Sequence, residues 1–294
     1  MQTIDSTTRR TVVRVEDQIH LGADSQVDDR NAIIPPTNPE LTDPFLLLAE
    51  DWFSTSGFEW HPHRGLETVT LVLDGVLEHG DNLGNAGALV AGDVQWMTAG
   101  RGIIHRELAF RNERAHVLQL WVNLPSEQKM VDTRYQDLRA PVRPVIERDG
   151  ARLDVISGHV DGTSGPALNN WPISGTLITL EPNSGLEHLV PAPDRAFFYV
   201  MSGAVTIDGH DLRAGQIAWS EPVPEAAVSA ITLTTGNADE PSVIMTYSGQ
   251  PIRQPVAMGG PFVMNSRAEI ERAIQDFHSG KFGEIPRQAR LSVR

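Results

Sequence analysis

Short apolar stretches closed by glycine or proline recur along almost the whole chain, and this pattern restricts the fold more than any other feature. In residues 67–75 (ETVTLVLDG), Val69 and Leu71 share one face of an extended segment, while Thr68 and Thr70 share the other. The 294 residues include 25 glycines and 20 prolines, which favour many short strands joined by turns. We therefore predict an all-β fold.

The length is about twice that of a usual domain, so two domains are expected. Residues 125–148 are charged and contain three prolines, as a crossing between domains would. The strand pattern then returns, and residues 199–221 loosely echo residues 71–98, which suggests an internal duplication. We predict an N-terminal domain over residues 1–135 and a C-terminal domain over residues 136–294.

The C-terminal part is the one place with a clear helical pattern. In residues 266–283 (SRAEIERAIQDFHSGKFG), Ser266 and Glu269 have the spacing of a capping box. Apolar residues follow at roughly helical spacing, and Gly280 suits the end of a helix. This predicts one amphipathic helix that packs on the β structure.

Composition excludes several classes of function. The net charge of −14, from 24 basic and 38 acidic residues, disfavours direct binding of nucleic acid or anionic lipid. There is no cysteine, which rules out disulfides, thiolate metal sites and thiol nucleophiles in this chain. The N-terminus lacks the apolar core of a signal peptide, and no apolar run has the length of a membrane helix. We expect a cytoplasmic protein.

Two residue pairs are the main candidates for functional residues in this sequence. His61 and His63 precede a strand, and His105 and Glu107 repeat the same spacing about forty residues later. Residues two apart leave an extended segment on one face, so each pair can aim two side chains at one point. If the strand after His63 continues without interruption, odd-numbered residues, Glu67 among them, lie on the histidine face.

Together the two pairs offer three imidazole nitrogens and one carboxylate to a single divalent ion. A buried imidazole without a partner costs about 1–3 kcal/mol, and coordination removes that cost. An octahedral ion held by four ligands keeps two positions for water or substrate, which redox or Lewis-acid chemistry requires. We predict a metal site at His61, His63, His105 and Glu107.

The residues around these pairs resemble the pirin family of the cupin superfamily. The resemblance is carried by residues 61–81 (HPHRGLETVTLVLDGVLEHGD) and 92–107 (GDVQWMTAGRGIIHRE), and it continues in 43–53, 118–130 and 259–283. It implies two stacked cupin β-barrels, a bicupin of double-stranded β-helix type, with metal in the N-terminal barrel only. It places the family's ligands on His61, His63, His105 and Glu107, usually with Fe(II); Ni, Cu, Mn or Zn also suit three His and one Glu.

Glu67 competes with Glu107 for the role of carboxylate ligand. Cupins in general place a ligand glutamate where Glu67 stands, whereas pirin-like proteins use the position of Glu107, and we favour Glu107. In the second half, Glu187 and His188 are adjacent and should point to opposite faces. We therefore expect the C-terminal barrel to hold no metal.

Three further polar residues are candidates for the surroundings of the metal. Glu67 is expected beside the ligands or at a strand end. His79, with Asp81, lies either in a surface turn or at the barrel mouth, where it would position substrate or relay a proton. Gln119 interrupts an apolar strand, and either lines the interior or bonds to backbone.

The resemblance implies two functions that the same ligands would serve. The first is a dioxygenase like quercetin 2,3-dioxygenase, which binds an aromatic, flavonol-type substrate and O2, with Glu107 as the catalytic base and Glu67 in reserve. The second is a non-enzymatic, iron-dependent redox sensor that binds a transcription factor or a metabolic enzyme. A vestigial or storage-type cupin with no redox role is the third alternative.

Overall fold

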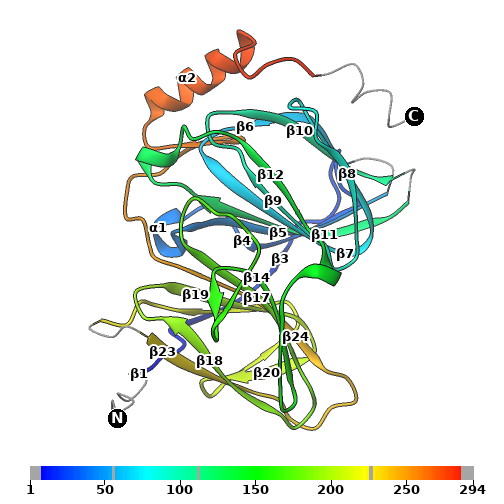
Figure 1. Cartoon of the computed structure of the whole chain (residues 1–294), viewed down its shortest axis with the longest axis vertical. Helices are drawn as coiled ribbons and strands as arrows, with labels where there is room; N and C mark the ends of the chain where they lie inside the picture. Colours follow the sequence, from blue (N-terminus) through cyan, green and yellow to red (C-terminus); the bar gives the residue numbers. More distant parts are fainter. Residues whose placement is uncertain (1–7, 55–56, 111–112, 225–227, 286–294) are drawn as a thin grey trace. The chain divides into compact units, whose positions relative to one another are not determined.

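The computed structural model describes residues 8–54, 57–110, 113–224 and 228–285. These residues are mostly β-strands, as predicted, and they form two compact units (Figure 1). We call residues 19–141 with 252–294 the N-terminal barrel, and residues 1–18 with 142–251 the C-terminal barrel. No helix in the described parts of the chain is long and apolar enough to cross a membrane.

The two units exchange chain ends relative to the predicted division after residue 135. The segment before Ile19 pairs with strands of the C-terminal barrel, because β2 (Arg14–Asp17) lies beside β22 (Gln216–Ser220). The segment after Pro251, with the C-terminal helix, belongs to the N-terminal barrel. The exchange arises from pairing between segments far apart in the chain, which a boundary drawn along the sequence does not capture.

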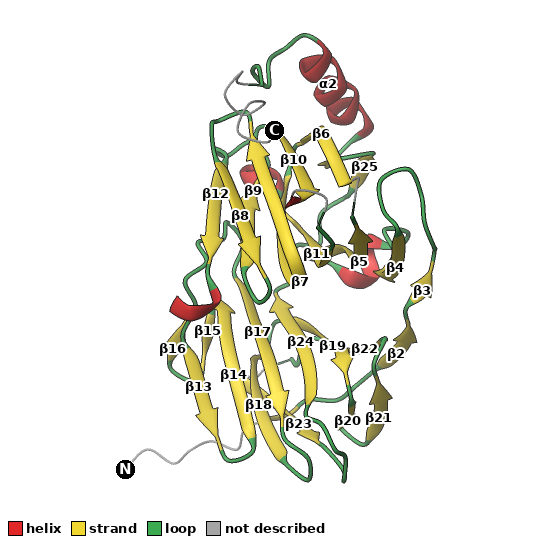
Figure 2. Ribbon diagram, turned by 90° about the vertical axis from the view of Figure 1, so that its right-hand side faces the viewer, coloured by secondary structure: helices red, strands yellow, loops and turns green. Residues whose placement is uncertain are grey.

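The N-terminal barrel is built on a ten-stranded sheet in the order β12-β9-β7-β11-β5-β4-β3, with β8, β10 and β6 attached through the long strand β7. Figure 2 shows these strands curving around one interior. Its elements are β3 (Ile19–His20), β4 (Asp29–Ile34), α1 (Pro39–Thr42), β5 (Phe45–Phe53), β6 (Gly57–His63), β7 (Leu66–Asp81), β8 (Ala86–Val90), β9 (Val94–Thr98), β10 (Ile103–Ala109), β11 (Ala115–Asn123), β12 (Arg134–Leu138), β25 (Ala257–Gly259), β26 (Phe262–Met264) and α2 (Arg267–His278).

The C-terminal barrel combines a seven-stranded sheet, in the order β13-β14-β17-β24-β19-β22-β2, with a five-stranded one around β23. Its interior is a continuous apolar core that includes Leu153, Ile178, Phe198 and Ile244. Its remaining strands are β1 (Thr8–Arg9), β13 (Val145–Arg148), β14 (Ala151–Ser157), β15 (His159–Val160), β16 (Thr163–Ser164), β17 (Ile173–Leu180), β18 (Gly185–Pro191), β19 (Arg195–Ser202), β20 (Ala204–Ile207), β21 (His210–Arg213), β23 (Val228–Thr234) and β24 (Ser242–Gly249).

The predicted C-terminal helix is confirmed as α2. Its N-cap is Ser266, whose hydroxyl accepts a hydrogen bond from the Glu269 backbone N–H, as a capping box requires. The side chains of Ile270 and Ala273 are buried in a cluster with Phe262 and Met264 of β26. This apolar face attaches the helix to the N-terminal barrel.

Candidate metal centre

The two predicted residue pairs meet on neighbouring strands. β6 and β10 run antiparallel with His61 opposite His105 and His63 opposite Ile103. Their imidazole rings are close, with centroids 4.9 Å apart for His61–His63 and 4.4 Å for His61–His105. One ligating atom from each of His61, His63 and His105 lies within 4.8 Å of the others. Strand pairing therefore gathers three imidazoles that are far apart in sequence.

Backbone carbonyls orient two of these rings. His61 Nδ1 lies 2.7 Å from the Glu59 carbonyl oxygen, and His63 Nδ1 lies 3.1 Å from that of Pro261. A carbonyl oxygen only accepts, so each Nδ1 carries the proton and each neutral ring keeps a lone pair on Nε2. This tautomer is the one that ligates a metal through Nε2.

The distances between the nitrogens suit coordination. The two Nε2 atoms of His61 and His63 are 3.1 Å apart. Two nitrogens bound at right angles, each about 2.1 Å from one ion, would be about 3.0 Å apart. His105 is fully buried, and neither of its ring nitrogens has a hydrogen-bond partner. These residues therefore fit a divalent metal ion.

Burial keeps the three imidazoles neutral. Desolvation lowers the pKa of His61, and it lowers the pKa values of His63 and His105 well below the usual value, with further lowering from neighbouring histidines. A metal ligand must be unprotonated, so burial prepares the rings for an ion before one binds.

Glu107 lies next to the histidine cluster without joining it. Its carboxylate accepts hydrogen bonds from Thr70 Oγ1 at 3.0 Å and from Gln119 Nε2 at 2.7 Å. Among the described residues, the group of mutually close ligand atoms contains the three histidines and not Glu107. Ligation by Glu107 thus stays a proposal. Gln119 lines the interior and holds this carboxylate, which agrees with one of its two predicted roles.

The expectation that Glu67 shares the histidine face was wrong. Its carboxylate accepts hydrogen bonds from Thr98 Oγ1 at 2.7 Å and Trp96 Nε1 at 3.0 Å, on the opposite face of the sheet from Thr70. The alternation breaks between β6 and β7 at Gly65, whose φ is +79°. Polar Thr68 and Thr70 therefore face the barrel interior.

His79 and Asp81 are also interior residues, so the surface-turn interpretation was wrong. They are 1% and 0% exposed, and they lie opposite Glu107 and His105 in the pairing of β7 with β10. The His79 ring is 5.4 Å from the His105 ring. Their strand, β7, carries an extra residue relative to β11 near Leu73, which moves odd-numbered residues to the interior.

The C-terminal segment also reaches the site, which no local sequence pattern had indicated. Pro261 holds His63, and Arg64 forms an ion pair of 2.9 Å with Asp276 of α2. Lys129, almost fully buried, donates to the carbonyls of Gly65 and Val263. Pro261 and Asp276 are about 200 residues away in sequence, and together with Lys129 they fix the backbone around His63.

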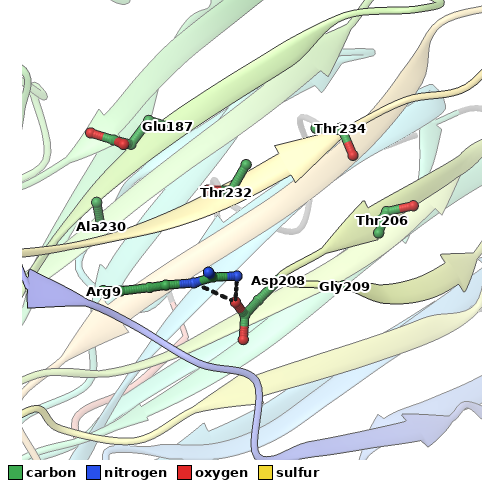
Figure 3. A pocket seen from close by; sticks show the side chains of 8 residues that line it. All are labelled: Arg9, Glu187, Thr206, Asp208, Gly209, Ala230, Thr232 and Thr234. Carbon is green, nitrogen blue, oxygen red and sulfur yellow. Dashed lines mark hydrogen bonds and ion pairs between the residues drawn. The ribbon is translucent and has the colours of Figure 1, made fainter.

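The C-terminal barrel offers no comparable chemistry in the parts that are described. Glu187 is exposed and His188 is buried, which confirms that these neighbours point to opposite faces. A hollow of about 270 Å³ lies on its five-stranded sheet (Figure 3). Its lining contains threonines and Arg9, which pairs with Asp208 at 2.7 Å. This lining lacks the imidazoles of the N-terminal barrel.

Comparison with known proteins identifies relatives along nearly the whole chain. The Pirin family model matches residues 33–122, and the model of the Pirin C-terminal cupin domain matches residues 176–283. Pirin-like protein 2 of Arabidopsis thaliana is 38% identical over 292 residues, which cover 95% of this chain and 87% of that protein. Pirin of Homo sapiens is 40% identical over 253 residues, which cover 83% of this chain and 85% of that protein.

Solved structures show the same architecture. A crystal structure of quercetin 2,3-dioxygenase from Acinetobacter baumannii is 32% identical, with a TM-score of 0.83. The match covers 95% of this chain and 100% of that one.

Proposed function

This chain belongs to the pirin family, and from that premise we propose that its N-terminal barrel is a metal-dependent dioxygenase acting on flavonol-type aromatic substrates such as quercetin. The cluster of three imidazoles, two of them buried and one partly buried, carries the proposal, because its geometry suits a bound ion. The similarity to a protein described as quercetin 2,3-dioxygenase supports the choice of substrate.

We assign the ligands to His61, His63, His105 and Glu107. A divalent ion with accessible redox states, Fe(II) above all, supplies when bound the one-electron chemistry that lets O2 react with an organic substrate. The two backbone carbonyls on His61 and His63 hold the ring orientation. His61 is the most exposed of the three histidines, which leaves an approach for substrate on its side of the cluster.

Glu107 is the base that we assign to the substrate hydroxyl. One carboxylate oxygen accepts from Thr70 and the other from Gln119, so its position is set by two strands at once. A carboxylate held in this way can take the hydroxyl proton of a flavonol that lies against the cluster. Glu67 does not serve as the reserve base, because its carboxylate lies with Thr98 and Trp96 on the opposite face of the sheet from Thr70.

The test uses the full chain loaded anaerobically with Fe(II), with O2 uptake and loss of quercetin absorbance as readouts. We expect turnover by the wild type. We expect His63→Ala to lose stoichiometric metal and to lower activity at least about 100-fold. Gln119→Leu should keep its metal but lower kcat by about tenfold or more, because the Glu107 carboxylate loses one of its two hydrogen-bond donors. His210→Ala, at an exposed position of β21, is the matched control.

Two outcomes would contradict the proposal. Stoichiometric metal without O2 uptake across a panel of flavonols and catechols would favour the redox-sensing regulator instead. A wild type that binds no metal would exclude both functions.

A further inference from the structure

Several buried polar side-chain atoms in the N-terminal barrel form no well-aligned hydrogen bond with the protein. Gln95 is 0% exposed, and neither its amide oxygen nor its amide nitrogen forms a hydrogen bond. Both ring nitrogens of His79 also lack one, since the Asp81 carboxylate is 3.6 Å away from Nε2. Buried polar groups are nearly always satisfied, and an unsatisfied one destabilises the fold. Such a group points to a ligand or water that completes it.

These atoms lie on one interior wall, made by β7, β9 and β12. Gln95 pairs with Thr70 of β7 and with Asp137 of β12, and paired residues point to the same side of a sheet. Thr70 is the residue that holds Glu107. The Tyr135 ring stacks on His79 at 4.5 Å, and His79 lies beside His105. The wall is therefore continuous with the histidine cluster.

The Tyr135 hydroxyl is buried on this wall but not covered by a side chain from β8. A Cβ atom at Gly87, the residue that pairs with His79, would lie 3.3 Å from the Tyr135 hydroxyl. The hydroxyl lies beside the Gln95 amide and the Asp137 carboxylate without a well-aligned hydrogen bond to either. Burial, with the Asp137 charge, raises the pKa of Tyr135, so the group stays a neutral hydroxyl.

An amide, a phenol and an imidazole each donate and accept hydrogen bonds, as hydroxyl groups do. We propose that Gln95, Tyr135 and His79 form a polar subsite that binds the ring hydroxyl groups of a polyhydroxylated aromatic substrate beside the metal centre. The proposal rests on the function proposed above and extends it, because it names the residues that distinguish hydroxylated from bare rings.

The test compares two substrates that present the same 3-hydroxy-4-keto group. Quercetin carries additional ring hydroxyls, and 3-hydroxyflavone does not. We expect Gln95→Leu and Tyr135→Phe each to lower kcat/KM for quercetin by about tenfold, mainly by raising KM. The same variants should change kcat/KM for 3-hydroxyflavone less than twofold. Gln136→Leu on the opposite face of β12 and Tyr199→Phe in the C-terminal barrel are the matched controls.

Thermal stability separates a binding role from a structural one. If the unsatisfied atoms of Gln95 serve a ligand, Gln95→Leu or Gln95→Met removes a buried polar group without a partner. The Tm of the ligand-free protein should then hold or rise by about 2–4 °C. A fall of the same size, with equal loss for both substrates, would show that Gln95 is structural and would overturn the subsite.

Binding measured without O2 distinguishes failure of the subsite from failure of the proposed enzyme. Quenching of tryptophan fluorescence gives Kd for both flavonols under anaerobic conditions. If the variants weaken binding of quercetin alone while no form consumes O2, the subsite stands and the dioxygenase does not. If the wild type turns over but the variants lose both substrates equally, the enzyme stands and the subsite is overturned. If neither flavonol binds, both proposals fail.

Discussion

At the scale of single residues, burial controls the protonation of the histidines in both barrels. Burial lowers the pKa values of His63 and His105 in the N-terminal barrel, and it lowers the pKa of His188 in the C-terminal barrel to about 4. In the first barrel the neutral rings face one another and offer lone pairs to an ion. In the second, His188 lies against Phe198, with ring centroids 6.1 Å apart, and no other histidine joins it among the described residues. Burial thus prepares metal ligands in the N-terminal barrel, whereas in the C-terminal barrel it makes the stability of the fold depend on pH.

His188→Leu should make the protein less sensitive to acid. The unfolded chain takes up a proton at His188 near pH 6.5, whereas the folded chain does so only near pH 4, so this residue destabilises the fold as pH falls between these values. Denaturant unfolding at pH 7 and pH 4 should show a shift of about 3 kcal/mol in favour of the variant.

The pH dependence of the free energy of unfolding must be compared as a difference between the His188→Leu variant and the wild type. Burial raises the pKa of Asp194 to about 6, so this group stabilises the fold as pH falls and opposes the effect of His188. His210→Leu, at an exposed position of the same barrel, is the control. An equal shift in both variants would count against the assignment to His188.

At the scale of elements, the long strand β7 determines which side chains reach the interior. Its first half turns Thr68, Thr70 and Val72 inward, and its second half turns Leu77, His79 and Asp81 inward. The change of parity follows from the extra residue near Leu73, and the strand then bends at Gly75. One strand thereby supplies groups to two parts of the same site.

Substitution of Gly75 should disrupt this bend and the site with it. Gly75 has φ of +76°, and a Cβ atom there would lie 1.6 Å from the Arg114 carbonyl oxygen. We expect Gly75→Ala to destabilise the protein by about 3 kcal/mol or more in urea unfolding, and to lower the amount of metal bound per protein molecule. Gly84→Ala tests the contribution of φ alone, because Gly84 has φ of +93° with nothing within 4 Å, and it should cost about 1–2 kcal/mol. Equal losses at the two glycines would refute the steric argument.

At the scale of the whole molecule, the two barrels differ in the content of their interiors. The C-terminal barrel is filled by one apolar cluster. The interior of the N-terminal barrel instead carries imidazoles, a carboxylate and unsatisfied amide atoms, which lowers its stability until ligands complete them. The N-terminal barrel thus contains the candidate metal ligands, and the C-terminal barrel is a packed β structure.

Metal binding should therefore protect one barrel selectively. Hydrogen exchange followed by mass spectrometry, with Fe(II) and with chelator, should show slower exchange in peptides from β6, β7 and β10 of the metal-loaded protein. Free metal at a concentration 100 times its Kd stabilises the folded form by about 2.7 kcal/mol. Hydrogen exchange that requires unfolding of that barrel therefore slows about 100-fold. Peptides from β17 and β24 should change far less. His63→Ala should abolish the difference, and uniform protection of all peptides would contradict a single site in the N-terminal barrel.

The all-β class, the capped helix α2 and the His61–His63 pair were predictable from sequence, because each depends on residues within a few positions of one another. Alternation, a capping box and His-x-His spacing are local, and local geometry carries them into the fold. Tertiary structure decided that Glu67 faces away from the histidines, because Gly65 breaks the alternation between β6 and β7. It also decided that His79 and Asp81 face the interior, because the extra residue near Leu73 reverses the side chains after it. It also brought Pro261 onto His63 and exchanged the chain ends between the barrels. Those contacts join segments about 200 residues apart in sequence. Packing and strand pairing select such distant partners, and neither leaves a periodic signal in the sequence around the residues that meet.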